Sequence, residues 1–187
     1  KIVELIATSM NTAVCSVYLK SNEDTLELCA TEGLNPSSVH KTTLKIGQGL
    51  VGDVALHARP LNLAEAKSHP RFVYLPETGE EAFQSFVGVP ILSGGTVIGV
   101  LVVQNTSHRS FVDEEIEALQ TVAMVLSEML AAEGQFRAVD ENLQGPARLV
   151  GYPLTEGLAI GQVVMHEPRV AVESLIAEDM DVEFSRL

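Results

Sequence analysis

The chain has 187 residues, of which 46% are hydrophobic, and its formal net charge is −13 at pH 7. That length suits one complete domain and part of another, with enough apolar residues for a core. No apolar run approaches the roughly 20 residues that span a bilayer. The excess of acid would repel nucleic-acid phosphates and anionic membranes. We therefore expect a protein that binds neither nucleic acid nor membranes. Its two cysteines, interpreted below as reduced thiols, lead us to expect a cytoplasmic location.

The first part of the chain predicts helices and strands in mixed order. Apolar residues recur at helical spacing over Lys1–Asn11, and again over Leu50–Ala58 behind the turn Gly47-Gln48-Gly49. Runs rich in apolar and β-branched residues, bounded by turn residues, predict strands at Val14–Lys20, Thr25–Thr31 and Leu61–Leu63. This mixture is typical of an α+β protein.

Two cysteines are too few for a disulfide scaffold. Alternation along the predicted strands places Cys15 on the face of Val17 and Cys29 on the face of Glu27. We therefore expect the two thiols to point to opposite faces of a sheet, where they cannot bridge, and to stay reduced.

An irregular segment, residues 64–84, leads into the hairpin on which the fold depends. Its prolines, its glycine and its mixed polar and aromatic residues argue against one continuous element, and such a long loop is usually functional. The apolar runs Phe86–Leu92 and Val97–Val103 follow, separated by Ser93-Gly94-Gly95. Neither run alternates with polar residues, so both faces of the sheet should be covered. We expect helices on one face of an antiparallel sheet, a loop layer on the other, and a cavity beneath the loops.

The longest helix is predicted from about Asp113 to about Asp140, with acidic residues in its first turn. It carries two apolar stripes: Ile116, Leu119, Ala123, Leu126 and Leu130; and Val122, Val125, Met129, Ala132 and Phe136. Two stripes exceed what a single surface helix needs, so we expect a homodimer formed through this helix and the first one. The alternative is a monomer in which Lys1–Asn11 covers the second stripe.

Gln144-Gly145-Pro146 interrupts the helical pattern and marks a domain boundary. Residues 1–140 should form the first domain and residues 141–148 a linker. Short strands are predicted at Leu149–Leu154 and Leu158–His166, in a tail (residues 149–187) that is too short to bury a core of its own.

The order of elements, together with several short motifs, resembles the GAF domain family. The motifs are Gly47-Gln48-Gly49-Leu50-Val51-Gly52, Arg59-Pro60-Leu61, Ser85-Phe86-Val87-Gly88-Val89-Pro90, Gly99-Val100-Leu101 and Phe111 before an acidic helix start. The resemblance covers about residues 1–139 and implies a GAF-like fold, with an antiparallel sheet, helices on one face and a ligand-loop layer on the other.

Two further stretches narrow the resemblance. His69-Pro70-Arg71-Phe72 and Pro76–Glu81 are similar to the GAF domain of nitrogen-branch phosphotransferase Enzyme I, a phosphoenolpyruvate–protein phosphotransferase. Residues 151–161 resemble the start of the phosphotransferase region that follows in such proteins, although Thr155-Glu156 stands where related enzymes often have Ser-Pro. The family's phosphorylated histidine lies beyond Leu187, so no catalytic residue is assigned and the fragment itself needs no cofactor. For the full-length protein, the resemblance implies Mg²⁺ with phosphoenolpyruvate and a histidine phosphocarrier protein as partner.

The resemblance also implies a metabolite sensor, with glutamine as its ligand and autophosphorylation as the activity that it controls. An amino acid needs a donor for its carboxylate, and Arg71 offers a guanidinium fork. The acids that could meet its ammonium are Glu65, Glu77, Glu80 and Glu81; the aromatic residues that could form walls are Phe72, Tyr74, Phe83 and Phe86. Ser85 could add a hydrogen bond. The plainer alternatives are that Arg71 pairs with a nearby acid, that the glutamates are solvated and that the aromatics are core.

Other functions stay open. Asn105, Phe111, Asp113 and Glu114 faintly resemble the signature of cyclic-nucleotide-binding GAF domains, without its lysine. Some GAF proteins reduce free methionine sulfoxide with cysteines, and others bind bilins, but neither cysteine lies near the ligand loop. A structural dimerisation module is the remaining alternative. The histidines, His40, His57, His69, His108 and His166, show no metal-ligand spacing. Gln104 and Asn105 are expected to cap a turn, the alternative being that they face the cavity.

Overall fold

A computed structural model describes the backbone of residues 1–143 and the side chains of residues 1–132. Residues Ile2–Gln135 form one compact unit. The linker and the strands predicted for residues 149–166 lie outside the described residues. No helix within the described part is both long and apolar enough to cross a bilayer.

The central element is a six-stranded antiparallel sheet with the strand order β3-β2-β1-β6-β5-β4. The strands are β1 (Val14–Lys20), β2 (Thr25–Glu32), β3 (Thr43–Lys45), β4 (Leu61–Leu63), β5 (Ser85–Ser93) and β6 (Thr96–Asn105). Within the described residues the predicted strands are confirmed, and β3 is an addition that the sequence analysis did not predict.

The hairpin of β5 and β6 turns more tightly than predicted. Ser93 pairs with Thr96, so the turn contains two residues, Gly94 and Gly95, with φ of 55° and 80°. A two-residue hairpin turn of type I′ requires positive φ at both of its central residues, and glycine adopts positive φ without strain.

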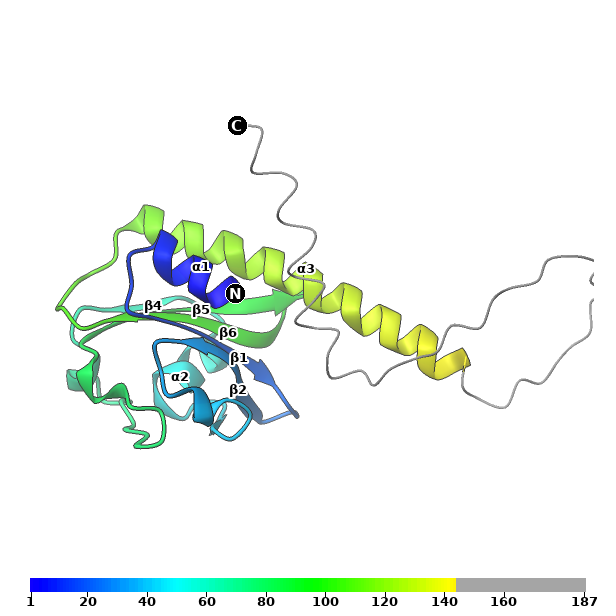
Figure 1. Ribbon diagram of the computed structural model, residues 1–187, viewed down its shortest axis with the longest axis horizontal. Coiled ribbons are helices and arrows are strands. Elements are labelled where there is room, and N and C mark those ends of the chain that lie inside the picture. Colours follow the sequence, from blue (N-terminus) through cyan, green and yellow to red (C-terminus); the bar gives the residue numbers. More distant parts are fainter. Residues whose placement is uncertain (144–187) are drawn as a thin grey trace, which may run out of the picture. The chain divides into compact units, whose positions relative to one another are not determined.

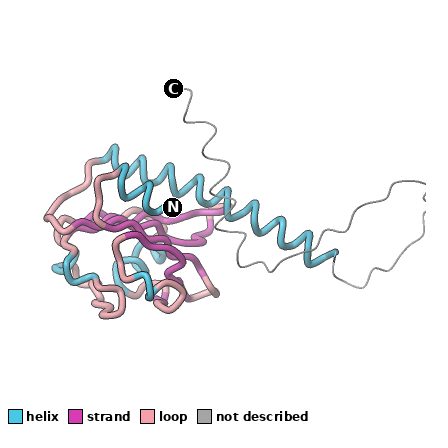
Figure 2. Tube along the Cα trace, in the orientation of Figure 1, coloured by secondary structure: helices cyan, strands magenta, loops and turns pink. Residues whose placement is uncertain are grey.

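Each face of the sheet packs against its own core (Figures 1 and 2). Helices α1 (Ile2–Ser9) and α3 (Asp113–Leu143) cover one face; α2 (Gly49–His57) and the loops cover the other. Alternate side chains of β5 and β6 enter opposite cores: Val87, Val89, Leu101 and Val103 on the helix side, and Phe86, Val100 and Val102 on the loop side. The prediction of a sheet buried on both faces, with helices on one and loops on the other, is confirmed.

The two stripes of α3 have different environments. Leu119, Ala123 and Leu126 of the first stripe are buried on the sheet. In the second stripe Val125 is 54% exposed and Met129 is 42% exposed. Val122, at the start of this stripe, is half-buried against the helix-side core. The described residues therefore leave the stripe open to solvent only at Val125 and beyond.

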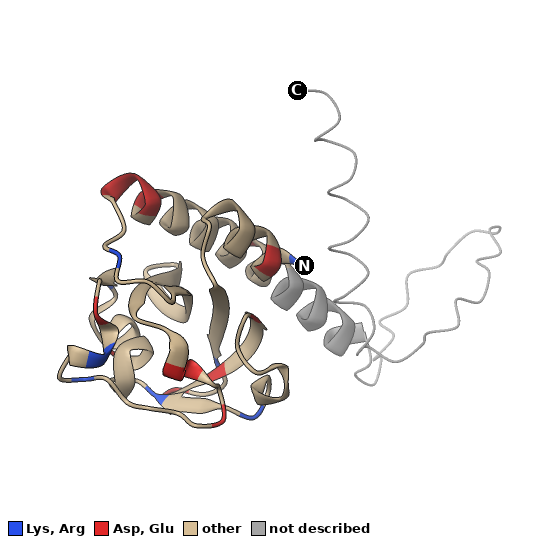
Figure 3. Cartoon of the chain, turned by 60° about the vertical axis from the view of Figure 1, so that its left-hand side comes forward, with Lys and Arg blue, Asp and Glu red and all other residues tan. Residues whose placement is uncertain are grey.

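Helix α3 begins with a charged first turn, Asp113, Glu114 and Glu115, as Figure 3 shows. Negative charge is favourable at this end of the helix dipole. Glu115 also accepts a hydrogen bond from the backbone nitrogen of Val112 at 3.0 Å and forms an ion pair with Arg109. The start of α3 is thus fixed by its own side chains.

An asparagine on β4 holds the segment that leads into α3. The Asn62 side-chain amide donates to the Phe111 carbonyl at 2.8 Å and accepts from the Phe111 nitrogen at 3.2 Å. Strand β4 also continues into the long loop 64–84. The Asn62–Phe111 pair therefore joins the root of that loop to the start of the longest helix.

A β-bulge changes the expected positions of the cysteines. Val17 lies opposite Ala30 and Tyr18 opposite Leu28, so Cys29 is an extra residue in β2. Glu27 pairs with Leu19 and shares its helix side, and the Cys29 sulfur lies within 4.8 Å of the Glu27 carboxylate, so Cys29 lies on the helix side, which is also the side of Cys15. The prediction of opposite faces was wrong because it assumed an unbroken register. Both cysteines are free thiols, as expected.

Candidate functional site

The first turn of α2 presents unpaired backbone donors. Gly47 and Gly49 take positive φ, 87° and 67°, so the chain turns sharply into the helix. The Gln48 side chain does not cap the helix but accepts from the Lys45 nitrogen at 3.0 Å. The first N–H groups of a helix lack partners within it and lie at the positive end of its dipole. This turn can therefore bind a carboxylate.

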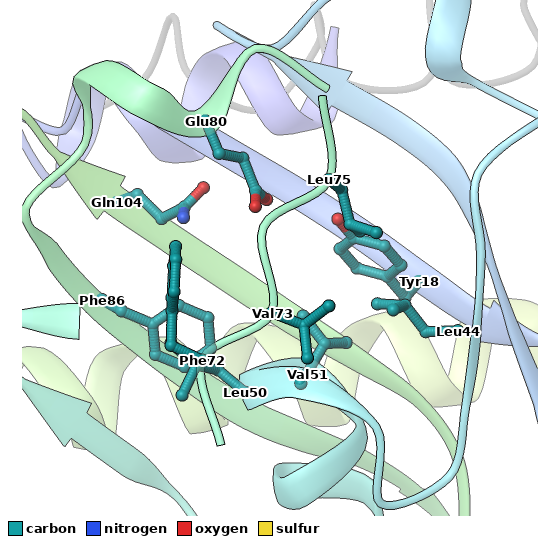
Figure 4. Close-up of a pocket in the computed structure, with 11 residues that line it drawn as sticks. Tyr18, Leu44, Leu50, Val51, Phe72, Val73, Leu75, Glu80, Phe86 and Gln104 are labelled. Atoms are coloured by element: carbon teal, nitrogen blue, oxygen red, sulfur yellow. The ribbon is translucent and has the colours of Figure 1, made fainter. Parts of the chain in front are cut away.

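A cavity lies between this turn, the sheet and the loop 64–84 (Figure 4). Its lining residues are Tyr18, Leu44, Gly49, Leu50, Val51, Phe72, Val73, Leu75, Glu80, Phe86 and Gln104. About 30 Å³ is available to the centre of a water molecule. One water needs about 10–15 Å³ on that measure, so the cavity holds a few waters and is smaller than the metabolite-sized hollow that we expected. An amino acid can enter only if the loop moves.

The loop is attached to α2 by Arg71. The Arg71 Nε lies 3.0 Å from Asp53 Oδ1, and its guanidinium donates to the Gly47 carbonyl at 3.3 Å. Asp53 is a buried residue of α2 and also lies 3.3 Å from the His57 Nδ1. The plainer alternative for Arg71, an ion pair with a nearby acid, thus describes the structure. We name the Arg71–Asp53 pair the loop latch.

Three polar side chains reach the cavity, which is otherwise mostly apolar. In Figure 4 the Glu80 carboxyl group, the Gln104 amide and the Tyr18 hydroxyl point towards the same space. Gln104 is 7% exposed and Tyr18 is 1% exposed, and neither side chain makes a hydrogen bond to another described residue. Buried polar groups are normally hydrogen-bonded. These two groups are therefore placed to bind a polar ligand or water.

Burial controls the protonation of these groups. It raises the pKa of the Glu80 carboxyl group to about 7, and the negative charge of Glu77 adds to that effect. Burial, followed by the charges of Glu80 and Glu77, also raises the pKa of the Tyr18 hydroxyl. Near neutral pH Glu80 can therefore carry or release a proton, whereas Tyr18 remains a donor.

Of the residues expected to bind ligand, the structure brings Phe72, Glu80 and Phe86 into the cavity lining. Glu65, Arg71, Tyr74, Phe83 and Ser85 are not part of it. Tyr74 is exposed and donates to the Glu81 carboxylate. Ser85 has the same strand parity as Val87 and so faces the helix-side core, where its hydroxyl has no partner among the described residues.

The family model described as GAF domain matches residues 1–130. The chain belongs to the GAF domain family.

Relatives of this GAF domain include proteins of one phosphotransferase system. The chain is 36% identical over 164 residues to the "Phosphoenolpyruvate-dependent phosphotransferase system" protein of Escherichia coli K12, an alignment that covers 84% of the chain and 21% of the relative. The chain therefore spans about a fifth of that protein's length.

Two solved structures are similar to this GAF domain. One is the GAF domain from a phosphoenolpyruvate-protein phosphotransferase of Coxiella burnetii, at 35% identity and a TM-score of 0.69, covering 73% of this chain and 82% of that one. The other is the corresponding Acinetobacter domain, at 34% identity and a TM-score of 0.66, with the same two coverages.

Sequence reasoning predicted only Glu80 among the three polar side chains of the cavity. Gln104 was expected to cap a turn, and the alternative, that it faces the cavity, describes the structure: it lies opposite Phe86 on the loop side of the sheet and lines the cavity. Asn105 does make turn contacts, accepting from the Thr106 nitrogen at 3.0 Å. Tyr18 was counted only as part of a strand. A polar residue near the end of an otherwise apolar strand was the available signal for Gln104.

The two thiols are poorly suited to redox catalysis. Burial, followed by the charge of Glu32, raises the pKa of Cys15 to about 12. Burial and Glu27 raise the pKa of Cys29, opposed by a backbone hydrogen bond from Leu19. The reactive form is the thiolate, and neither cysteine lines the cavity. The geometry thus gives no support to a methionine sulfoxide reductase.

We predict that Glu80 makes the GAF domain less stable as the pH rises from about 5 to 7. Its folded-state pKa of about 7 exceeds the ordinary 4.5, so the folded state binds the proton more tightly, and this contribution to stability is lost as the pH rises through the folded pKa. One fully shifted group contributes at most about 1.4 kcal/mol per pH unit. Urea unfolding at several pH values should show a smaller decline in Glu80→Gln than in the wild type.

Glu77→Gln serves as the comparison, because it removes the neighbouring charge but keeps the Glu80 carboxyl group. It should reduce the decline only in part. An unchanged decline in Glu80→Gln would contradict the assignment.

Proposed function

We propose that this GAF domain is the regulatory sensor of a nitrogen-branch phosphoenolpyruvate–protein phosphotransferase, and that it binds glutamine to control autophosphorylation. The observation that carries this proposal is the cavity in which a helix N-terminus faces three polar side chains. The similarity to GAF domains of phosphoenolpyruvate-protein phosphotransferases supports the protein class.

The cavity offers a complementary group for each polar part of glutamine. The N–H groups of the first turn of α2 would donate hydrogen bonds to the α-carboxylate. The Glu80 carboxylate would meet the ammonium, whose charge would lower the pKa of this acid and keep it ionised. The Gln104 amide and the Tyr18 hydroxyl would bind the side-chain amide. Leu50 and Phe86 would contact its methylene groups.

Binding would require the loop 64–84 to open and close again. The loop side chains Phe72, Val73 and Leu75 occupy the space over the cavity. They would move outwards as the loop latch opens. Reclosure over glutamine would favour one of two loop positions, and a ligand shifts such an equilibrium by its difference in affinity for the two states.

The rest of the enzyme would supply the chemistry. Residues 149–187 would begin the phosphotransferase region, and the complete protein would use Mg²⁺ with phosphoenolpyruvate and pass its phosphoryl group to a histidine phosphocarrier protein. The GAF domain would contribute no catalytic residue. Its influence would pass from the loop through β4 and the Asn62–Phe111 hydrogen bonds to α3.

We predict that calorimetry will detect glutamine binding to the 187-residue chain, and that Gln104→Leu will weaken it at least about tenfold. This loss corresponds to about 1.4 kcal/mol, within the range for a buried hydrogen bond left unmade. Gln120→Leu on α3 is the matched control and should bind as the wild type does. Glutamate and cyclic nucleotides should give little or no heat.

A domain that binds cyclic nucleotides but not glutamine would refute the choice of ligand. No heat from any of these compounds, in a folded protein, would favour the alternative of a structural dimerisation module.

We predict that glutamine will change the autophosphorylation rate of the full-length enzyme. Asn62→Ala should bind glutamine but show a smaller change in rate, because it removes both hydrogen bonds between β4 and the segment before α3. The measurement is phosphoryl transfer from labelled phosphoenolpyruvate with and without glutamine. If the wild-type enzyme autophosphorylates at the same rate with and without glutamine, regulation through this domain is refuted. The prediction of glutamine binding would stand independently of that result.

We also propose that two copies of the domain associate through α3 and α1. The exposed residues Val125 and Met129 continue an apolar stripe on α3, and Leu5 of α1 is exposed as well. In a two-fold dimer both copies use the same surface, so the stripe of one α3 would pack against the stripe of the other.

We predict that Val125→Asp will convert a dimer into a monomer in light scattering after size-exclusion chromatography. Burying an unpaired carboxylate at the interface would cost several kcal/mol. Leu56→Asp is the matched control, because Leu56 is 51% exposed on α2, on the other face of the sheet. A wild-type monomer at high protein concentration would contradict the proposal.

A further inference from the structure

Three side chains with metal-binding atoms meet on strand β2 and the segment that follows it. The ligand atoms of Glu27, Cys29 and His40 all lie within 4.8 Å of one another. The His40 Nδ1 is 2.7 Å from the Glu27 carboxylate. Their sequence spacing does not resemble a metal motif, because the fold rather than the chain brings the histidine to the other two.

The backbone holds these residues in place. Glu27 and Cys29 alternate with Leu26 and Leu28, which are fully buried in the loop-side core. The Glu27 side chain therefore points to the opposite face, and the Cys29 sulfur lies within 4.8 Å of its carboxylate. His40 has a φ of 59°, and its N–H donates to the Leu28 carbonyl at 2.8 Å, between the two strand residues. A non-glycine residue in the left-handed region is uncommon and indicates that the surrounding structure fixes this turn.

The combination of donors suits one class of metal. Thiolate, imidazole and carboxylate are the three ligand types of protein zinc sites, with Zn–S of about 2.3 Å and Zn–N and Zn–O of about 2.0–2.2 Å. In a tetrahedron those bonds place the donors roughly 3.3–3.6 Å apart. The His40–Glu27 distance of 2.7 Å is shorter than that spacing, and all three atoms lie within 4.8 Å of one another. Rotation about the side-chain bonds can bring them to the distances that the metal needs. All three side chains are at least partly exposed, so an ion has access.

We propose that Glu27, Cys29 and His40 form a Zn²⁺ site, with water as the fourth ligand. When the metal binds, the Cys29 thiol releases its proton to solvent and the resulting thiolate coordinates the ion. The Glu27 carboxylate and the His40 imidazole become ligands on the same ion. The site faces away from the cavity, so it does not depend on the proposed function.

Co²⁺ provides the test, because a cobalt–thiolate bond gives a near-ultraviolet charge-transfer absorption that oxygen and nitrogen ligands do not. Titration of the reduced, metal-free 187-residue chain with Co²⁺ should produce this absorption, and Zn²⁺ should abolish it by displacement. Cys29→Ser should lose the absorption. His40→Ala and Glu27→Gln should weaken Co²⁺ binding at least about tenfold.

The matched control is Cys15→Ala, which removes the buried cysteine and should keep the absorption. Circular dichroism checks that each variant is folded, and the exposed His40→Ala variant keeps the test valid if Cys29→Ser unfolds. The proposal is overturned if the wild type shows no charge-transfer absorption, if Cys29→Ser retains it, or if His40→Ala binds Co²⁺ as tightly as the wild type.

Discussion

The rest of the structure depends on burial of the sheet on both of its faces. Because successive side chains of a strand point to opposite sides, every second residue of β5 and β6 belongs to a different core. Helices α1 and α3 cover the helix side and bury an apolar core there. The loop side has the short helix α2 and irregular segments, which cover the sheet less completely. The cavity lies on that side for this reason.

The loop-side layer combines features that favour a small polar ligand. A helix N-terminus without a side-chain cap, a carboxyl group with a raised pKa and a buried amide surround one space. Their concentration at one place makes this cavity the candidate binding site. The loop latch, the ion pair between Arg71 and Asp53, fastens the loop 64–84 to α2 and so keeps the loop over the cavity.

Strand β4 and helix α3 connect the loop layer to the other face of the sheet. The Asn62 amide satisfies both backbone groups of Phe111. Phe111 itself is buried in the helix-side core. A displacement of β4, from which the loop 64–84 begins, would therefore move Phe111 and the start of α3. Along α3, the stripe that contains Val125 and Met129 remains exposed, so the helix has surface left for a partner after it has covered the sheet.

The sequence by itself determined the strands β1, β2, β4, β5 and β6, the three helices and burial on both faces, because these depend on the periodicity of neighbouring residues. The tertiary structure alone decided which side chains meet. It turned Arg71 towards Asp53, brought Gln104 and Tyr18 to one cavity, and placed His40 beside Glu27. Such contacts depend on register and on the path of loops. A single bulge at Cys29 changes the face of a side chain without any change in local composition.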